Sequence, residues 1–111
     1  MKTVRNITEI KPFLPKIRKI IKSIYGNRLV DIILYGSFAR NKASQESDID
    51  ILTILKGDVN RIIEINKIQN ELYKIELETG ELISVYPVSE EEYNTSVWPL
   101  YYYARKEGIK I

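Results

Sequence analysis

Two aspartates one residue apart, Asp48 and Asp50, lie inside an apolar run typical of a β-strand, Asp48 to Leu55 (DIDILTIL). Because side chains alternate across a strand, we expect both carboxylates on one face, with Ile49 and Ile51 on the other, in the core. The two charges repel and lose hydration on burial, whereas a divalent cation between them makes the arrangement favourable. Two carboxylates facing substrate phosphate oxygens are a typical Mg²⁺ environment. Taken alone, such a pair is more often the solvated end of a strand or a pair of caps.

A second motif, Gly36-Ser37, stands at the end of an earlier apolar run, Leu29 to Tyr35 (LVDIILY), that predicts another strand. A glycine at a strand-to-helix turn lets the backbone approach an anion, and the N–H groups that follow point at it. Ser37 adds a hydroxyl donor, and Arg40 could reach the same phosphates. Either feature alone is ordinary, but with the aspartates on a neighbouring strand they predict a phosphate cradle facing a metal site. We count Ser47, directly before Asp48, among the expected nucleotide-binding residues.

The amino-acid composition excludes several kinds of chemical site in this chain. The chain has 111 residues, 44% apolar and 29% charged, which indicates one compact soluble domain over residues 1–111. A net charge of +2 excludes a basic nucleic-acid surface over the whole chain. With no cysteine or histidine, disulfides, thiol chemistry, a histidine base and Cys/His zinc sites are excluded, so any metal is a hard cation such as Mg²⁺ or Mn²⁺. No apolar run nears the ~20 residues of a membrane helix, and MKTVRNITEIKP lacks a signal-peptide core, so we expect a cytoplasmic protein.

Periodicity predicts the elements that position these residues. Thr8 is the expected cap of a helix that Gly26 ends, and Asp58 the expected cap of a long helix that Gly80 ends. The apolar stripes of the two helices comprise Ile10, Phe13, Leu14, Ile17, Ile20, Ile21 and Ile24, then Val59, Ile62, Ile63, Ile65, Ile68, Leu72 and Ile75. A turn over Phe38–Arg40 and a polar loop over 41–47 join the first two strands. A third strand, Leu82 to Val88, carries Pro87, which favours an edge position or a strand end.

Short helices from Ser89 and over Pro99–Lys106 come last, before a tail at Ile109–Ile111. The order predicts one α/β (α+β) domain, in which helices flank a mixed sheet of three or four strands.

The combination of Gly36-Ser37, ten intervening residues and Asp48-Ile49-Asp50 resembles the signature of the nucleotidyltransferase superfamily that includes DNA polymerase β, and in particular the minimal nucleotidyltransferase (MNT) group. The resemblance implies the polymerase β-like fold, with Gly36 and Ser37 on a nucleotide triphosphate and Asp48 and Asp50 on Mg²⁺. It implies transfer of AMP from ATP to a hydroxyl, with release of pyrophosphate. It also implies an antitoxin whose partner is a helical HEPN protein, adenylylated on tyrosine.

One departure from the family pattern concerns the third carboxylate, expected on the strand after the long helix. Alternation along ELISVYPV puts Ser84 at that place, with Glu81 on the opposite face. Glu81 or Glu78 could substitute, although an exposed surface glutamate is the favoured interpretation of both. A second hypothesis is therefore a catalytically weak nucleotide-binding module that neutralises its partner by binding. A small-molecule nucleotidyltransferase is a weaker third, because no added substrate domain is present.

The aromatic stretch VWPLYYYARKEG near the C-terminus either forms a partner surface or closes the sheet edge. Three adjacent tyrosines, Tyr101 to Tyr103, cannot all face one core, so at least one must lie at a surface or interface. A chain this small must obtain acceptor recognition from a partner or from its own oligomer.

Overall fold

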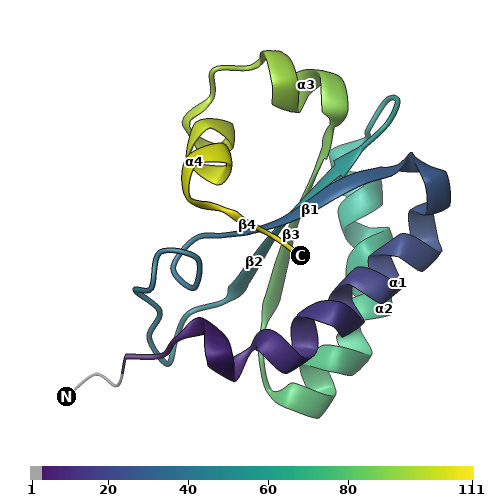
Figure 1. The fold of residues 1–111 in the computed structure, drawn as a ribbon. Coiled ribbons are helices and arrows are strands. Elements are labelled where there is room, and N and C mark those ends of the chain that lie inside the picture. Colours follow the sequence, from purple (N-terminus) through teal and green to yellow (C-terminus); the bar gives the residue numbers. More distant parts are fainter. Residues whose placement is uncertain (1–3) are drawn as a thin grey trace.

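The structure of the protein is a computed structural model that describes residues 4–111. Its centre is a four-stranded sheet in the order β3-β2-β1-β4 (Figure 1). The strands are β1 (Leu29–Tyr35), β2 (Ile49–Leu55), β3 (Ile83–Ser89) and β4 (Ile109–Lys110). Helices α1 (Leu14–Tyr25) and α2 (Arg61–Thr79) cover one face, and α3 (Glu90–Thr95) and α4 (Pro99–Glu107) cover the other. The predicted α+β class is confirmed.

The sheet is mixed. Strands β1 and β2 are antiparallel, whereas β2 and β3 are parallel and joined by α2, because a parallel pair needs a long crossover connection. Strand β3 is an edge strand, which confirms the position that Pro87 predicted. Strand β4 was not predicted: the expected tail adds two residues to the free edge of β1, beside Ile33 and Leu34.

Each face of the sheet has its own core. Ile49 and Ile51 pack with the apolar faces of α1 and α2, as their alternation predicted. Leu52 and Ile54 point the other way and pack under α3 and α4. Tyr101 of α4 is fully buried there, and its ring meets those of Tyr86, Tyr93 and Trp98 at centroid distances of 5.5–6.3 Å. The sheet face that carries Asp50 is therefore covered by α4 away from the strand end, so this face is not open along its whole length.

Both predicted helix starts were wrong, although the ends at Gly26 and Gly80 are confirmed. Asn6 rather than Thr8 provides the N-terminal cap, and it caps a 3₁₀ turn (Ile7–Glu9). A second 3₁₀ turn (Lys11–Phe13) follows before α1 starts at Leu14, with Pro15 in its first turn, where a missing N–H is tolerated. Asn60 rather than Asp58 caps α2, accepting from Ile63 N at 3.3 Å.

The apolar stripe of α2 was also only partly right. Ile68, Leu72 and Ile75 are buried, but Ile62 and Ile63 are 75% and 55% exposed. The buried position of the first turn belongs instead to Glu64, whose carboxylate accepts a hydrogen bond from Tyr25 Oη at 2.7 Å and lies 3.4 Å from Lys67 Nζ. Glu64, with two partners for its charge, therefore occupies the contact between α1 and α2, where the prediction had placed isoleucines. No helix among residues 4–111 is both long and apolar enough to cross a membrane.

Thr53 of β2 is fully buried, and its Oγ1 makes no hydrogen bond to any residue that the structure describes. We expect Thr53→Val to raise the free energy of unfolding by about 1 kcal/mol, because it removes an unpaired buried hydroxyl while keeping the branched shape. Urea denaturation of the two proteins measures the difference. A destabilised variant would show that the hydroxyl does have a partner.

Candidate active site

The Gly-Ser motif and the aspartates meet at one end of the sheet. Tyr35, the last residue of β1, pairs with Asp50 of β2, and Gly36 follows with a φ of +77°, a left-handed conformation that favours glycine. A Cβ placed on Gly36 would collide with Oδ2 of Asp50. Gly36 therefore satisfies two demands at once, the turn of the backbone and the close approach of the carboxylate.

After Gly36 the chain makes a hydrogen-bonded turn over residues 37–41, where a short helical turn was predicted and no helix is formed. Arg40 N donates to Gly36 O at 3.1 Å, and Lys42 N donates to Ser37 O at 2.8 Å. Phe38 is buried at 2% exposure and anchors the turn in the core under α1. Ser37 is partly buried, whereas Arg40 is exposed and its side chain is available to an anion.

The carboxylate of Asp50 lies close enough to Asp48 to be affected by its charge. Burial and, to a lesser extent, the nearby charge of Asp48 raise the pKa of Asp50, and although Arg40 opposes them the result is a pKa of about 6. Asp48 itself lies directly before β2 and is partly buried. Two neighbouring carboxylates match the donor set that a hard divalent cation takes.

No third carboxylate, imidazole or thiolate joins these two aspartates among the described residues. Within residues 4–111, no three or more Asp, Glu, His or Cys side chains gather where they could hold a metal ion. The donor set therefore fits a cation shared between two carboxylates and substrate phosphates rather than one enclosed by protein.

Ser47 is held in the loop before β2. Its Oγ accepts from Ser44 N at 2.8 Å, and its own N–H donates to Ser44 O at 3.1 Å. The hydroxyl hydrogen is left for another acceptor. The loop thus fixes the residue directly before Asp48.

The place of the third carboxylate is occupied by serine. Ser84 of β3 is the partner of Asp50 in the parallel register, so Tyr35, Asp50 and Ser84 form one row across three strands. Ile83 and Val85 are buried on the opposite face, as the alternation predicted. The row ends in a hydroxyl that is a weak base at neutral pH.

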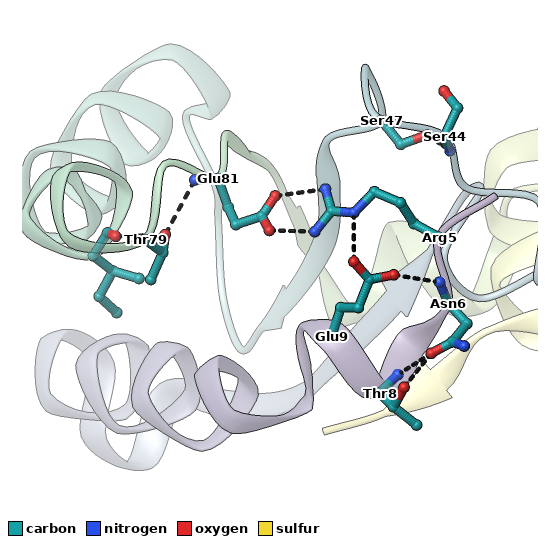
Figure 2. Close-up of polar contacts among 9 residues, drawn as sticks. Arg5, Asn6, Thr8, Glu9, Ser44, Ser47, Thr79 and Glu81 are labelled. Atoms are coloured by element: carbon teal, nitrogen blue, oxygen red, sulfur yellow. Dashed lines mark hydrogen bonds and ion pairs between the residues drawn. The ribbon is translucent and has the colours of Figure 1, made fainter. Parts of the chain in front are cut away.

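Glu81 does not supply the missing carboxylate. It faces Arg5 in a two-pronged ion pair, with Nη1 to Oε1 at 2.9 Å and Nη2 bonded to Oε2 (Figure 2). Its side chain is only 13% exposed, so the expectation of a surface glutamate was wrong for Glu81, whereas Glu78 is exposed as expected.

Arg5 connects Glu81 to the site loop. Arg5 N donates to Ala43 O at 2.8 Å, and its guanidinium lies 5.1 Å from the ring centre of Phe38 and 3.2 Å from Glu9. The two glutamates raise the pKa of Arg5. Glu81 therefore fastens the start of β3 to the N-terminal segment and to the loop that precedes Asp48.

We expect Glu81→Gln to lower the free energy of unfolding by about 1–3 kcal/mol, because a charge-assisted pair is lost at a largely buried guanidinium. Nucleotidyl transfer by the folded variant should stay within a few-fold of wild type. Urea denaturation and a transfer assay below the unfolding midpoint measure the two effects. A large loss of transfer in a fully folded variant would assign the base to Glu81 after all.

The sequence did not reveal the wall that α4 builds beside this site. A cavity of about 450 Å³ lies between Gly36 and Arg40 on one side and Leu100 and Tyr103 of α4 on the other. The tyrosine run divides as predicted: Tyr101 is buried, whereas Tyr102 and Tyr103 are 50% and 52% exposed. Helical periodicity in PLYYYARK places Leu100 and Tyr103 three residues apart on one side, the one signal that could have shown the wall.

The fold and the Gly-Ser/Asp-x-Asp geometry define a class, the polymerase β-like nucleotidyltransferases. The nucleotidyltransferase domain family matches residues 14–109, and the chain belongs to that family. It is therefore a nucleotidyltransferase.

Similar proteins agree with this family. Two proteins of Methanocaldococcus jannaschii, both named "putative protein adenylyltransferase", are 35% identical over 79% of this chain and 83% of their own length, and 31% identical over 68% and 76%. A chain in a crystal structure of a mutant of the toxin-antitoxin MntA-HpeT has the same fold. Its TM-score is 0.61 at 20% identity, over 87% of this chain and 69% of that one.

Proposed function

We propose that this nucleotidyltransferase transfers AMP from ATP to a hydroxyl of a partner protein, and that it acts in the cytoplasm as the antitoxin of a helical HEPN-type toxin. The observation that carries the proposal is the contact between Gly36 and the carboxylate of Asp50, with Asp48 beside it. It places a backbone turn suited to phosphates against a pair of carboxylates suited to a cation. The names of the relatives support a protein acceptor, and that of the structural neighbour supports a toxin partner.

Each residue has a separate task in this proposal. The turn that starts at Gly36 and Ser37 offers backbone N–H groups and a hydroxyl to the triphosphate, and the exposed guanidinium of Arg40 neutralises its charge. Ser47 has a hydroxyl hydrogen to donate beside them. A divalent cation between Asp48 and Asp50 would bind phosphate oxygens and stabilise the charge that develops in transfer.

The row Tyr35–Asp50–Ser84 favours a tyrosine acceptor. A strand neighbour of Asp50 that carried a carboxylate could take a proton from an aliphatic hydroxyl, but Ser84 is a poor base. A phenol has a pKa of about 10 and loses its proton far more readily than an aliphatic alcohol. A site with two carboxylates is therefore better matched to a phenolic oxygen.

The same serine supports a second candidate, a binding module that neutralises its partner without turnover. Radiolabelled ATP, the purified chain and the HEPN-type partner, with Mg²⁺ or with EDTA, distinguish the two. We expect label on the partner with Mg²⁺ and none with EDTA, and loss of label when the partner's acceptor tyrosine is phenylalanine. Neutralisation without label would reject transfer and leave the binding module.

A further inference from the structure

The cavity between the end of β1 and α4 is chemically divided. Gly36 and Arg40 line one side, and Leu100 and Tyr103 of α4 line the other. At about 450 Å³ it has the size of a small-molecule site. The Arg40 side suits phosphates, whereas the α4 side, which also includes the carboxylate of Glu107, repels a phosphate and offers an aromatic ring to a flat base.

Tyr35 links this cavity to the aspartates. It lines the cavity and pairs with Asp50 across the strands. Tyr35 is partly buried, and its phenolic hydroxyl is a hydrogen-bond donor. Tyr35 therefore lies between the cavity and Asp50 and brings a hydrogen-bond donor to that place.

The in-line geometry of the transfer reaction indicates which of the two substrates the cavity holds. In phosphoryl and nucleotidyl transfer the attacking and leaving oxygens are roughly in line. With pyrophosphate held at Gly36 and Arg40 on the β1 side, the acceptor approaches from the opposite side, toward Ser84 on β3. The α4 cavity lies on the β1 side and so does not lie on that path.

We propose that this cavity holds the nucleoside of the nucleoside triphosphate and that Tyr103 stacks on the base. This inference rests on the proposed nucleotidyl transfer and adds α4 to the binding site. Tyr103 is 52% exposed, and its ring meets Tyr102 edge to face, with centroids 5.1 Å apart. A base that covers the exposed ring buries apolar area and gains the stacking that aromatic side chains offer every base.

The test compares two ligands that share phosphates and differ in the nucleoside: ATP and inorganic tripolyphosphate, each titrated in Mg²⁺. We expect Tyr103→Ala to raise the Kd for ATP at least about fivefold, the lower end of base stacking, and to leave the Kd for tripolyphosphate unchanged. Tyr103→Phe keeps the ring and should bind ATP like wild type. Tyr73→Ala is the matched control, because it removes a similarly exposed ring, on α2, that does not line the cavity.

Two outcomes would overturn the inference without touching the proposed transfer. One is an unchanged Kd for ATP in Tyr103→Ala, with or without a raised KM for the partner. The other is an equal loss for ATP and tripolyphosphate, which would place the effect at the phosphates. A wild-type chain that transfers no label from ATP would instead reject the proposed function.

Discussion

Asp50→Asn should lower the rate of AMP transfer by about 100-fold or more, the scale of removing one charged group from the stabilisation of a transition state. Asparagine keeps the size and the packing against Gly36 but removes the charge that binds a cation. Initial rates of label transfer at saturating ATP and Mg²⁺ measure the loss. The matched control is Asp31→Asn in the neighbouring strand β1, because the one ion pair of Asp31 among the described residues is an exposed pair with Lys110.

The Asp50→Asn protein should also be at least as stable as wild type at pH 7. The pKa of Asp50 rises from an ordinary 3.8 to about 6 on folding, so the folded state binds more protons between these pH values. Wild-type stability in EDTA should therefore fall as pH rises from about 4 to 6 and stay lower above that range, since the folded carboxylate is then charged. The variant should lack this slope in urea denaturation. A variant that loses both transfer and stability would mean that Asp50 mainly supports the fold.

Gly36→Ala is the second large effect. It forces a side chain into a backbone with φ of +77° and drives a methyl group into the carboxylate of Asp50. We expect a loss of about 1–3 kcal/mol in the free energy of unfolding. We also expect transfer to fall by about 10-fold or more, because displacement of a catalytic group by even ~1 Å is expensive in rate.

Gly57→Ala separates the two causes of the Gly36→Ala defect. Gly57 has a φ of +80°, nearly that of Gly36, but a Cβ there meets no atom within 4 Å. Gly57→Ala should lose only the part of the free energy of unfolding that the left-handed backbone accounts for, and it should keep its transfer activity. Adding Asp50→Ala to Gly36→Ala should restore part of the stability but none of the transfer. Equal losses of stability in Gly36→Ala and Gly57→Ala would show that the contact of residue 36 with Asp50 is unimportant.

The sheet around the aspartates could be predicted because the side chains of each strand alternate regularly between the two faces. Alternation alone put Ile49 and Ile51 in the core and Ser84 beside Asp50, and the register confirms both. Helix starts were less predictable, since Asp58 and Asn60 can both cap and only the path of the chain decides between them. Ile62 and Ile63 were wrongly predicted to be buried, because three closely spaced isoleucines do not reveal which side of the helix faces the core. The contact between Glu64 and Tyr25, which are 39 residues apart in the sequence, determines that side.

The residues of the candidate site also divide into those that the sequence reveals and those that only the structure reveals. Gly36, Ser37 and the aspartates are near in sequence and carry a recognisable spacing, so the amino-acid sequence alone is enough to find them. Tyr103 comes more than 50 residues after Asp50, and its place depends on how Tyr101 packs α4 on the sheet. Likewise Glu81 was predicted to be a surface residue because its partner, Arg5, is 76 positions away.

The contact between Gly36 and Asp50 also constrains how such a sequence can change over generations. A larger residue at position 36 collides with the carboxylate, so it becomes tolerable only after position 50 has been shortened. The reverse order passes through an unstable intermediate. A lineage that abandons transfer and keeps the fold should therefore lose Asp50 first and Gly36 later. Descendants with a glycine at 36 and no acid at 50 should outnumber those with the opposite pair.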